Sequence, residues 1–174
     1  MTKKALISVF CTDQTGLIAS ITGSLFNLGL NLAATSFNVL GSGCEFNAVA
    51  EIPEDLTFNE IDEDLRSLDL PNDAQISVTP FLHEPNQTAN SHITHKVKVW
   101  GGDRPGLIAR LCEVFGDYKA NIVRMSAERV LEDNAEKYVI RFSVFMTDEN
   151  EDKCLATISN TAGSLKLDCS WQKL

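Results

Sequence analysis

An internal repeat is the feature of this sequence that most constrains its fold. The pattern Asp, two variable residues, Gly, Leu, Ile, Ala occurs at residues 13–19 and again at residues 103–109, 90 positions later. Each copy lies between an alternating apolar run and a run with helical spacing, so it predicts a turn from a strand into a helix. A chain of 174 residues that repeats such a unit predicts two domains of about 80 to 90 residues, each with its own hydrophobic core.

The two halves predict the same order of elements. Alternation of apolar and polar residues indicates the strands, and apolar residues three and four positions apart indicate the helices. Thr57 and Asn150 are the expected N-caps of the second helix in each half. The expected ranges are 5–11, 17–28, 32–40, 46–52, 58–68 and 75–79 in the first half, and 94–100, 107–118, 122–131, 138–146, 151–162 and 166–171 in the second.

This order predicts an α+β fold of two tandem ferredoxin-like (βαββαβ) domains, each a four-stranded antiparallel sheet with two helices on one face. The second strand is expected at an edge of each sheet, where it is open to pairing with another sheet. Superposing the repeats places Phe10 with Trp100, and Leu6 with Lys96, on the face that the helices leave uncovered. We expect another sheet or subunit to cover that face, and hence a homo-oligomer.

The expected domain boundaries follow from composition. Residues 81–91 have no hydrophobic periodicity and are rich in Pro, Asn, Gln and Thr, which predicts a linker. We therefore expect the first domain at residues 1–82, the linker at 83–92 and the second domain at 93–174.

Charge is divided unequally between the halves. Residues 1–85 hold 3 Lys and Arg against 12 Asp and Glu, whereas residues 86–174 hold 12 of each, so the net charge of −9 belongs to the first half. A chain without a Lys/Arg cluster is poorly equipped to neutralise phosphates, which argues against direct binding of nucleic acid. No apolar run has the length of a membrane span or the form of a signal peptide, so the expected location is the cytoplasm, with no membrane partner.

Cysteine and histidine offer little support for metal chemistry. The five cysteines have no paired spacing and most lie among apolar residues, which predicts buried free thiols in place of disulfides or a zinc site. His83, His92 and His95 lie near the linker, and we interpret them as solvated linker and strand-edge residues.

At the repeated turn the sequence resembles the ACT domain, a small ligand-binding module found in many enzymes and regulators of amino-acid metabolism. The resemblance covers nearly the whole chain as two copies. It rests on the Asp-x-x-Gly-Leu-Ile pattern after the first strand, an Asn that opens the second strand, and the order of elements. The second copy matches more fully, because it has Pro105 where the first has Thr15.

The resemblance implies a function as well as a fold. It implies a non-enzymatic, amino-acid-responsive regulator of glycine metabolism, without a cofactor, whose effector is glycine or a similarly small amino acid. Such a regulator would be a transcriptional repressor that acts through a protein partner, for example a DNA-binding activator, and not by contacting DNA itself. ACT domains commonly bind amino acids between this turn and the edge strand of a neighbouring domain.

The physical chemistry of an α-amino acid indicates the same region. A helix N-terminus exposes unpaired N–H groups and the positive end of the helix dipole, which suit a carboxylate. Carboxylate and amide oxygens near the turn suit the ammonium, and Arg104 belongs to the fuller second motif. The candidate ligand-binding residues are Asp13, Gly16, Leu17, Ile18 and Asn31 in the first copy, and Asp103, Arg104, Gly106, Leu107, Ile108 and Asn121 in the second.

Other interpretations of these residues stay open. Asp13 and Asp103 would also serve as helix caps, and the glycines would permit close packing of helix on strand. A small ferredoxin-like enzyme is a weaker alternative, because no catalytic set of Ser, His and Asp or of Cys and His occurs at usable spacing. A third alternative is a ligand-independent protein-interaction module. Its acidic surface, around the second helix, would comprise Glu54, Asp55, Glu60, Asp62, Glu63, Asp64 and Asp69.

Overall fold

The chain forms two compact units, Met1–Pro85 and Asn86–Leu174. The computed structural model describes residues 3–83, 91–132 and 135–174. Most of the predicted linker, residues 84–90, therefore lies outside the described residues, and the predicted domain boundaries stay a prediction. The centre of the second predicted hairpin turn, residues 133–134, also lies outside the described residues.

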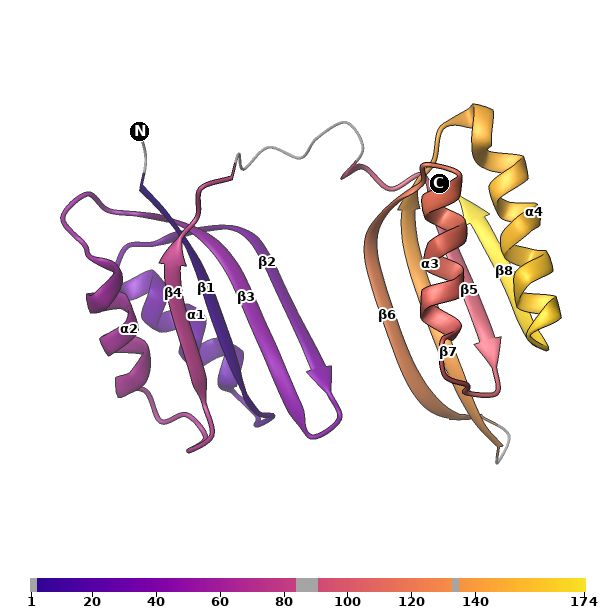
Figure 1. Ribbon diagram of the computed structural model, residues 1–174. Helices are drawn as coiled ribbons and strands as arrows, with labels where there is room; N and C mark the ends of the chain where they lie inside the picture. Colours follow the sequence, from indigo (N-terminus) through magenta and orange to yellow (C-terminus); the bar gives the residue numbers. More distant parts are fainter. Residues whose placement is uncertain (1–2, 84–90, 133–134) are drawn as a thin grey trace. The chain divides into compact units, whose positions relative to one another are not determined.

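Unit 1 is a four-stranded antiparallel sheet with two helices on one face (Figure 1). The strand order is β2-β3-β1-β4. Strands β2 and β3 are therefore adjacent, whereas the connections from β1 to β2 and from β3 to β4 each cross over a strand. This is the predicted βαββαβ arrangement. Its elements are β1 (Lys3–Thr12), α1 (Leu17–Asn27), β2 (Asn31–Leu40), β3 (Gly43–Ile52), α2 (Phe58–Ser67) and β4 (Gln75–Pro80).

Unit 2 repeats this topology with the strand order β6-β7-β5-β8. Helices α3 and α4 pack on the same face of its sheet (Figure 1). The α+β fold expected from the sequence is thus confirmed in both halves. The elements of this unit are β5 (His95–Gly101), α3 (Leu107–Asp117), β6 (Asn121–Glu132), β7 (Ala135–Phe145), α4 (Asp148–Ser164) and β8 (Leu167–Lys173).

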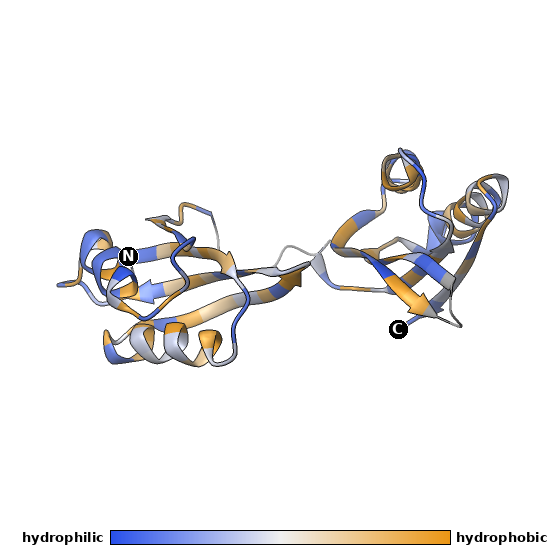
Figure 2. Ribbon diagram, turned by 90° about the horizontal axis from the view of Figure 1, so that it is seen from below, coloured by the Kyte–Doolittle hydropathy of each residue, from blue (hydrophilic) through white to orange (hydrophobic). Residues whose placement is uncertain are grey.

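Each unit has its own core between sheet and helices. Figure 2 shows hydrophobic and hydrophilic residues alternating along the strands, and the hydrophobic residues of the inner face are buried. In β1 this set includes Ile7 and Val9, and in β5 it includes Val97 and Val99, as the alternation predicts. The spacing of apolar residues in the helices has the same result, since the apolar stripes of α1 and α3 face the sheet.

The N-termini of α2 and α4, the second helix of each unit, are capped differently. Thr57 caps α2 as expected: its hydroxyl accepts from Glu60 N–H, and the Glu60 carboxylate accepts from Thr57 N–H in return. The prediction that Asn150 caps the other helix is wrong. Helix α4 begins at Asp148, its N-cap is Thr147, and three acidic side chains in its first turn favour the earlier start.

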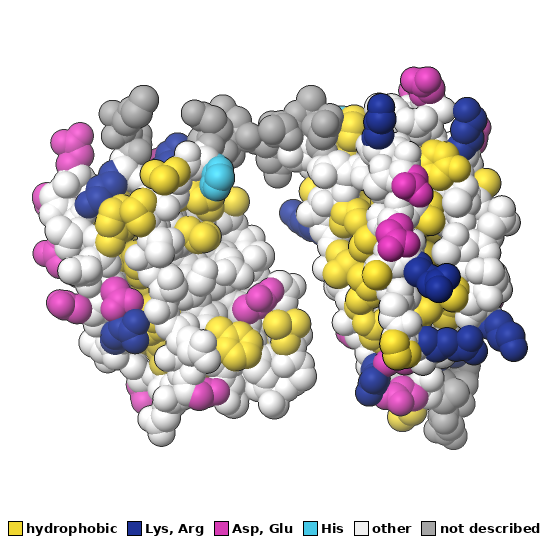
Figure 3. All heavy atoms as spheres, in the orientation of Figure 1, with side chains coloured by type: hydrophobic (Ala, Val, Ile, Leu, Met, Phe, Trp, Pro, Cys, Tyr) yellow, Lys and Arg dark blue, Asp and Glu magenta, His cyan; other side chains and the backbone are white. Residues whose placement is uncertain are grey.

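The outer faces and the edges also agree with expectation. Strands β2 and β6 lie at sheet edges. On the uncovered face of unit 1, Leu6 is 36% exposed and Phe10 is 43% exposed, and Figure 3 shows hydrophobic side chains scattered over this unit's surface. In unit 2, Lys98 Nζ lies 4.9 Å from the ring centre of Trp100 on the matching face. The expected covering sheet or subunit stays a prediction.

Candidate functional site

The two repeated turns have nearly the same backbone. Gly16 and Gly106 are the N-caps of α1 and α3, with φ of +87° and +85°. This left-handed conformation favours glycine, because a Cβ is strained there. A Cβ at either position would meet nothing within 4 Å. Close packing of helix on strand, one interpretation of the sequence, is therefore wrong for these glycines, and backbone conformation explains them.

The prediction that Asp13 and Asp103 cap the helices is also wrong. Neither α1 nor α3 has a side-chain cap hydrogen bond, because a glycine occupies the N-cap position and the aspartate stands three residues before it. Asp103 instead accepts from the Arg129 guanidinium, with Nε at 3.1 Å and Nη2 at 2.7 Å from Oδ2. This pairing raises the pKa of Arg129, so the carboxylate is held in place by a cation from β6.

Backbone donors gather at the start of each helix. In α1 the Leu17 N–H donates to the Gln14 carbonyl, 3.3 Å, and the Ser20 N–H donates to the Gly16 carbonyl, 3.0 Å. In α3 the Arg110 N–H donates to the Gly106 carbonyl, 3.1 Å. The N–H groups of Leu107 and Ile108 lie before Arg110, in the first turn of α3. Together with the positive end of the helix dipole, such groups form an anion site.

In unit 2 these donors face an open hollow of about 450 Å³. Tyr138 brings β7 to the hollow, since it pairs with Arg129 on β6 and with Gly101 on β5. The hollow thus combines a helix N-terminus, a carboxylate and a guanidinium at one end of the sheet. Its lining residues are Asp103, Arg104, Gly106, Leu107, Ile108, Ala109 and Tyr138.

The turn of unit 1 is tied down by other contacts. Asp73 accepts from both the N–H and the hydroxyl of Thr12, at 3.1 and 2.8 Å from Oδ2, and the Thr12 donors lower the pKa of Asp73. Asp13 N–H donates to the Ser42 carbonyl, 2.9 Å. Gln14, which stands where the second copy has Arg104, donates to the Asp69 carbonyl, 3.3 Å. The first copy therefore lacks the cation that lines the hollow in the second.

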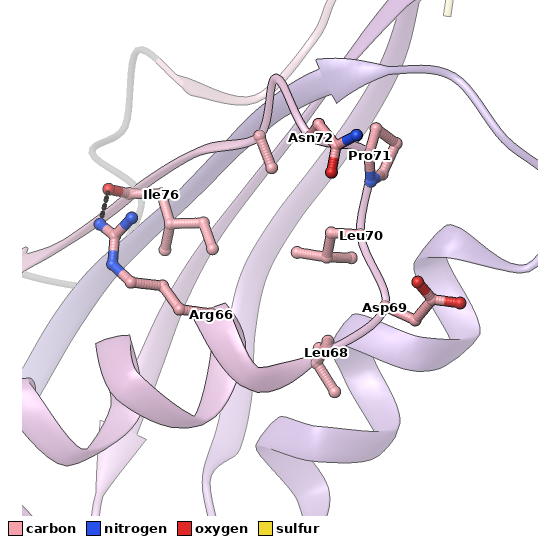
Figure 4. Close-up of a pocket in the computed structure, with 8 residues that line it drawn as sticks. Arg66, Leu68, Asp69, Leu70, Pro71, Asn72 and Ile76 are labelled. Atoms are coloured by element: carbon pink, nitrogen blue, oxygen red, sulfur yellow. Dashed lines mark hydrogen bonds between the residues drawn. The ribbon is translucent and has the colours of Figure 1, made fainter.

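Another hollow in unit 1, of about 410 Å³, lies between the end of α2 and the start of β4 (Figure 4). Its cation is Arg66, which is already engaged. Arg66 Nε donates to Asp62, 2.6 Å, and Nη2 donates to the Ile76 carbonyl, 3.1 Å. These bonds leave this hollow a weaker anion site than the one at α3.

The two asparagines lie far from the turns of their own units. Asn31 is opposite Glu51, which in turn is opposite Lys4 on β1, whereas the turn of unit 1 follows Thr12. Eight residues of strand separate them by roughly 26 Å. Asn121 pairs with Phe145 at the His95 end of the sheet, again opposite the turn. Within one unit, the structure does not bring the predicted ammonium acceptors Asn31 and Asn121 to the predicted carboxylate donors.

A buried histidine escaped the sequence interpretation. His95 is 1% exposed, so its assignment as a solvated strand-edge residue is wrong. Its Nε2 lies 3.1 Å from Glu151 Oε1, and Lys173 Nζ lies 2.5 Å from Glu151 Oε2. The alternation of His95 with Val97 and Val99 was the signal, because it places all three on the inner face. The cluster joins β5, α4 and β8.

The cysteines fit the expectation of free thiols. All five are free, and Cys11, Cys44 and Cys154 are buried. Burial raises the pKa of Cys154 and of Cys169 to about 11.

Over the described ranges, no group of three or more His, Cys, Asp or Glu side chains is placed to hold a metal ion. Within that same part of the chain, none of the helices has the length and apolar character needed to cross a membrane.

The second half of the chain matches a known domain family. The family model of the ACT domain matches residues 95–153, which include β5, the turn, α3, β6 and β7. The second unit contains an ACT domain. Unit 1 has the same topology, so the chain consists of two tandem units of ACT-like fold.

Two crystal structures share this architecture over the full chain. One is an unknown protein from Galdieria sulphuraria, 18% identical, with 100% of this chain and 99% of that chain covered and a TM-score of 0.77. The other is a candidate glycine cleavage system transcriptional repressor, 15% identical, with 100% and 98% covered and a TM-score of 0.70. No curated protein matches the sequence. At these identities the likeness shows a shared fold of two tandem units and nothing more.

Proposed function

We propose that this chain is a non-enzymatic, cytoplasmic regulator that binds a small amino acid, such as glycine, at the ACT turn of unit 2 and acts through a protein partner. The hollow at the start of α3 carries the proposal, because it presents groups of both signs to one small volume. An α-amino acid is a zwitterion and needs both.

Each end of the ligand has a matching group. The carboxylate is bound by the N–H groups of Leu107 and Ile108 and by the Arg104 guanidinium. The ammonium is bound by the Asp103 carboxylate, which Arg129 holds in place at 2.7 Å. Exposure of the Asp103–Arg129 pair, 38% and 63%, leaves the carboxylate accessible to a ligand.

The two copies are proposed to divide the work. In unit 1 the equivalent of Arg104 is Gln14, whose amide is already bonded to the Asp69 carbonyl, so that turn has weaker attraction for a carboxylate. We assign amino-acid binding to unit 2 for this reason. Unit 1, which holds the whole net charge, is assigned to the contact with the partner.

The acidic surface around α2 supports a basic protein partner. Part of it serves the fold: Asp62 pairs with Arg66, Glu60 belongs to the capping box, and Asp64 accepts from the Ser24 hydroxyl. Glu54, Asp55 and Glu63, by contrast, are exposed. The shared fold with a candidate glycine cleavage repressor supports transcriptional repression as the outcome, through a DNA-binding activator and not through DNA.

Calorimetric titration of the full chain with glycine, alanine, serine and larger amino acids tests the binding claim. Arg104→Gln, which copies the unit 1 residue, should weaken binding about tenfold or more, since it removes a charge-assisted hydrogen bond. Gln14→Ala is the matched control and should bind normally. Equal loss of affinity in both variants, or no heat with any amino acid, would contradict the assignment.

A ligand-independent interaction module is the second candidate, and the exposed acids of unit 1 favour it. One measurement distinguishes the sensor from the ligand-independent module: the affinity for a basic partner protein with and without amino acids. If a basic activator protein binds the chain with the same affinity in the presence and absence of every amino acid tested, the module stands and the sensor fails. Specific, salt-sensitive DNA binding by the purified chain would contradict both.

A further inference from the structure

We propose that Cys11 and Cys44 form a redox-modification site, a dithiol that closes to a disulfide by exchange with a small disulfide such as oxidised glutathione. The two residues are directly opposite each other on β1 and β3. Their sulfur atoms lie 3.9 Å apart, and each residue is 1% exposed. The proposal does not depend on amino-acid binding at unit 2.

The backbone already has the spacing of a disulfide. Directly opposed residues of antiparallel strands have Cα atoms about 4.5 to 5.5 Å apart, and disulfides span Cα separations of about 4.4 to 6.8 Å. Closing the sulfur atoms from 3.9 Å to a bond of about 2.05 Å is therefore within reach of side-chain rotation on strands of this spacing.

The pair belongs to unit 1 alone. At the matching positions of unit 2, Gly101 is opposite Tyr138. The remaining cysteines come from separate elements: Cys112 from α3, Cys154 from α4 and Cys169 from β8. They serve as internal controls, since each would need an unrelated partner.

The exchange balances as two successive displacements. One cysteine thiolate attacks a sulfur of the small disulfide, forms a mixed disulfide and releases one small thiolate, which takes up a proton. The second cysteine, as its thiolate, attacks the protein sulfur of the mixed disulfide and releases the other small thiolate. Two protein thiols lose two electrons and two protons in total, and one small disulfide becomes two thiols.

Burial sets the conditions of the reaction. Burial, and then the hydrogen bond with Cys44, raise the pKa of Cys11 to about 11, so little thiolate is present at neutral pH and exchange is slow. The pair lies where β1 ends at Thr12 and β3 begins at Gly43, beside the hairpin turn. Local opening at this end of the sheet admits the small disulfide.

Oxidation would act on the turn of unit 1. Cys11 precedes Thr12 and Asp13, which begin that turn, and Asp13 N–H already donates to the Ser42 carbonyl. A disulfide adds a covalent link between β1 and β3 at the root of the turn. It should raise the melting temperature of the oxidised chain by about 5 °C or more, because it restricts the unfolded chain.

The test uses the full chain in a glutathione redox buffer at pH 8.5, followed by alkylation in denaturant and peptide mapping by mass spectrometry. The expected product is a Cys11–Cys44 disulfide, two mass units lighter than the dithiol. It should be absent in Cys44→Ala and present in Cys112→Ala. The rise in melting temperature should likewise be lost in Cys44→Ala.

Two results would overturn the proposal. One is that Cys11 and Cys44 are both recovered in alkylated form, which shows that they stayed reduced, while Cys112 or Cys169 carries glutathione. The other is that the disulfides formed join cysteines at random, with no preference for this pair. A folded Cys44→Ala chain, checked by circular dichroism, ensures that its lack of the product reflects the missing thiol.

Discussion

At the scale of single residues, the two copies share one backbone and differ in chemistry. Gly16 and Gly106 have φ of +87° and +85°, yet Gln14 is bonded to its own unit whereas Arg104 lines a hollow. The repeated glycine thus accounts for the conformation of the turn, whereas the residues at the variable positions differ in their contacts. This is why the Asp-x-x-Gly pattern predicted the fold of the turn better than its ligand.

Replacing Gly106 by alanine should lower the free energy of unfolding by about 1 to 2 kcal/mol, because the left-handed conformation strains a Cβ. Gly102→Ala is the matched control: its Cβ would also meet nothing within 4 Å, and no positive φ is required there. Chemical denaturation of both variants measures the difference. Equal stability of the two would show that the positive φ of Gly106 has no energetic cost for alanine.

The Glu151 cluster predicts a pH dependence of stability. The hydrogen bond from Lys173, and less strongly the adjacent His95 ring, hold the pKa of Glu151 below its ordinary value. A lowered folded-state pKa adds stability above the unfolded pKa of about 4.5, and this stability is lost as pH falls through the folded value. Urea denaturation between pH 3 and pH 6 should show a steeper acid loss in the wild type than in Glu151→Gln. Parallel curves would exclude this role.

At the scale of elements, the predicted starts of α1, α2 and α3 agree with the structure, whereas α4 begins at Asp148 and not at residue 151. Thr57 was identified as a cap because its hydroxyl precedes an apolar stripe and Glu60 completes the capping box. The start of α4 was missed, since Asp148 and Glu149 interrupt the apolar spacing while they favour the helix dipole. The prediction that Asp13 caps α1 was wrong for a related reason. The sequence does not give the backbone φ of each residue, and Gly16, with its positive φ, takes the N-cap position.

Removal of the Thr57 cap should be measurable. Thr57→Ala should lower the free energy of unfolding by about 1 kcal/mol, because it removes the hydroxyl that accepts from Glu60 N–H at 3.2 Å. Thr147→Ala at the N-cap of α4 is the control, since Thr147 makes no side-chain cap bond. Thermal denaturation of the two variants compares them, and a larger loss in Thr147→Ala would refute the assignment.

At the scale of the whole chain, the repeat predicted two units of one topology, and the sheet orders confirm it. Alternation was sufficient for β1, β3 and β5, because each of these strands has one buried face. The candidate site was predicted less well, since Asn31 and Asn121 follow the helices in sequence and thus open strands at the far end of each sheet. For His95 the alternation with Val97 and Val99 correctly indicates a buried position. Its proximity to the linker in sequence wrongly suggested a surface position.

The proposed binding of a small amino acid at the start of α3 can be measured directly. Amide chemical shifts of the ¹⁵N-labelled chain, recorded during titration with glycine, test it residue by residue. Saturable shifts are expected at Gly106, Leu107 and Ile108, with the matching amides of Gly16, Leu17 and Ile18 unchanged. Shifts confined to the unit 1 turn, or no shifts at millimolar glycine and with the other small amino acids, would contradict it.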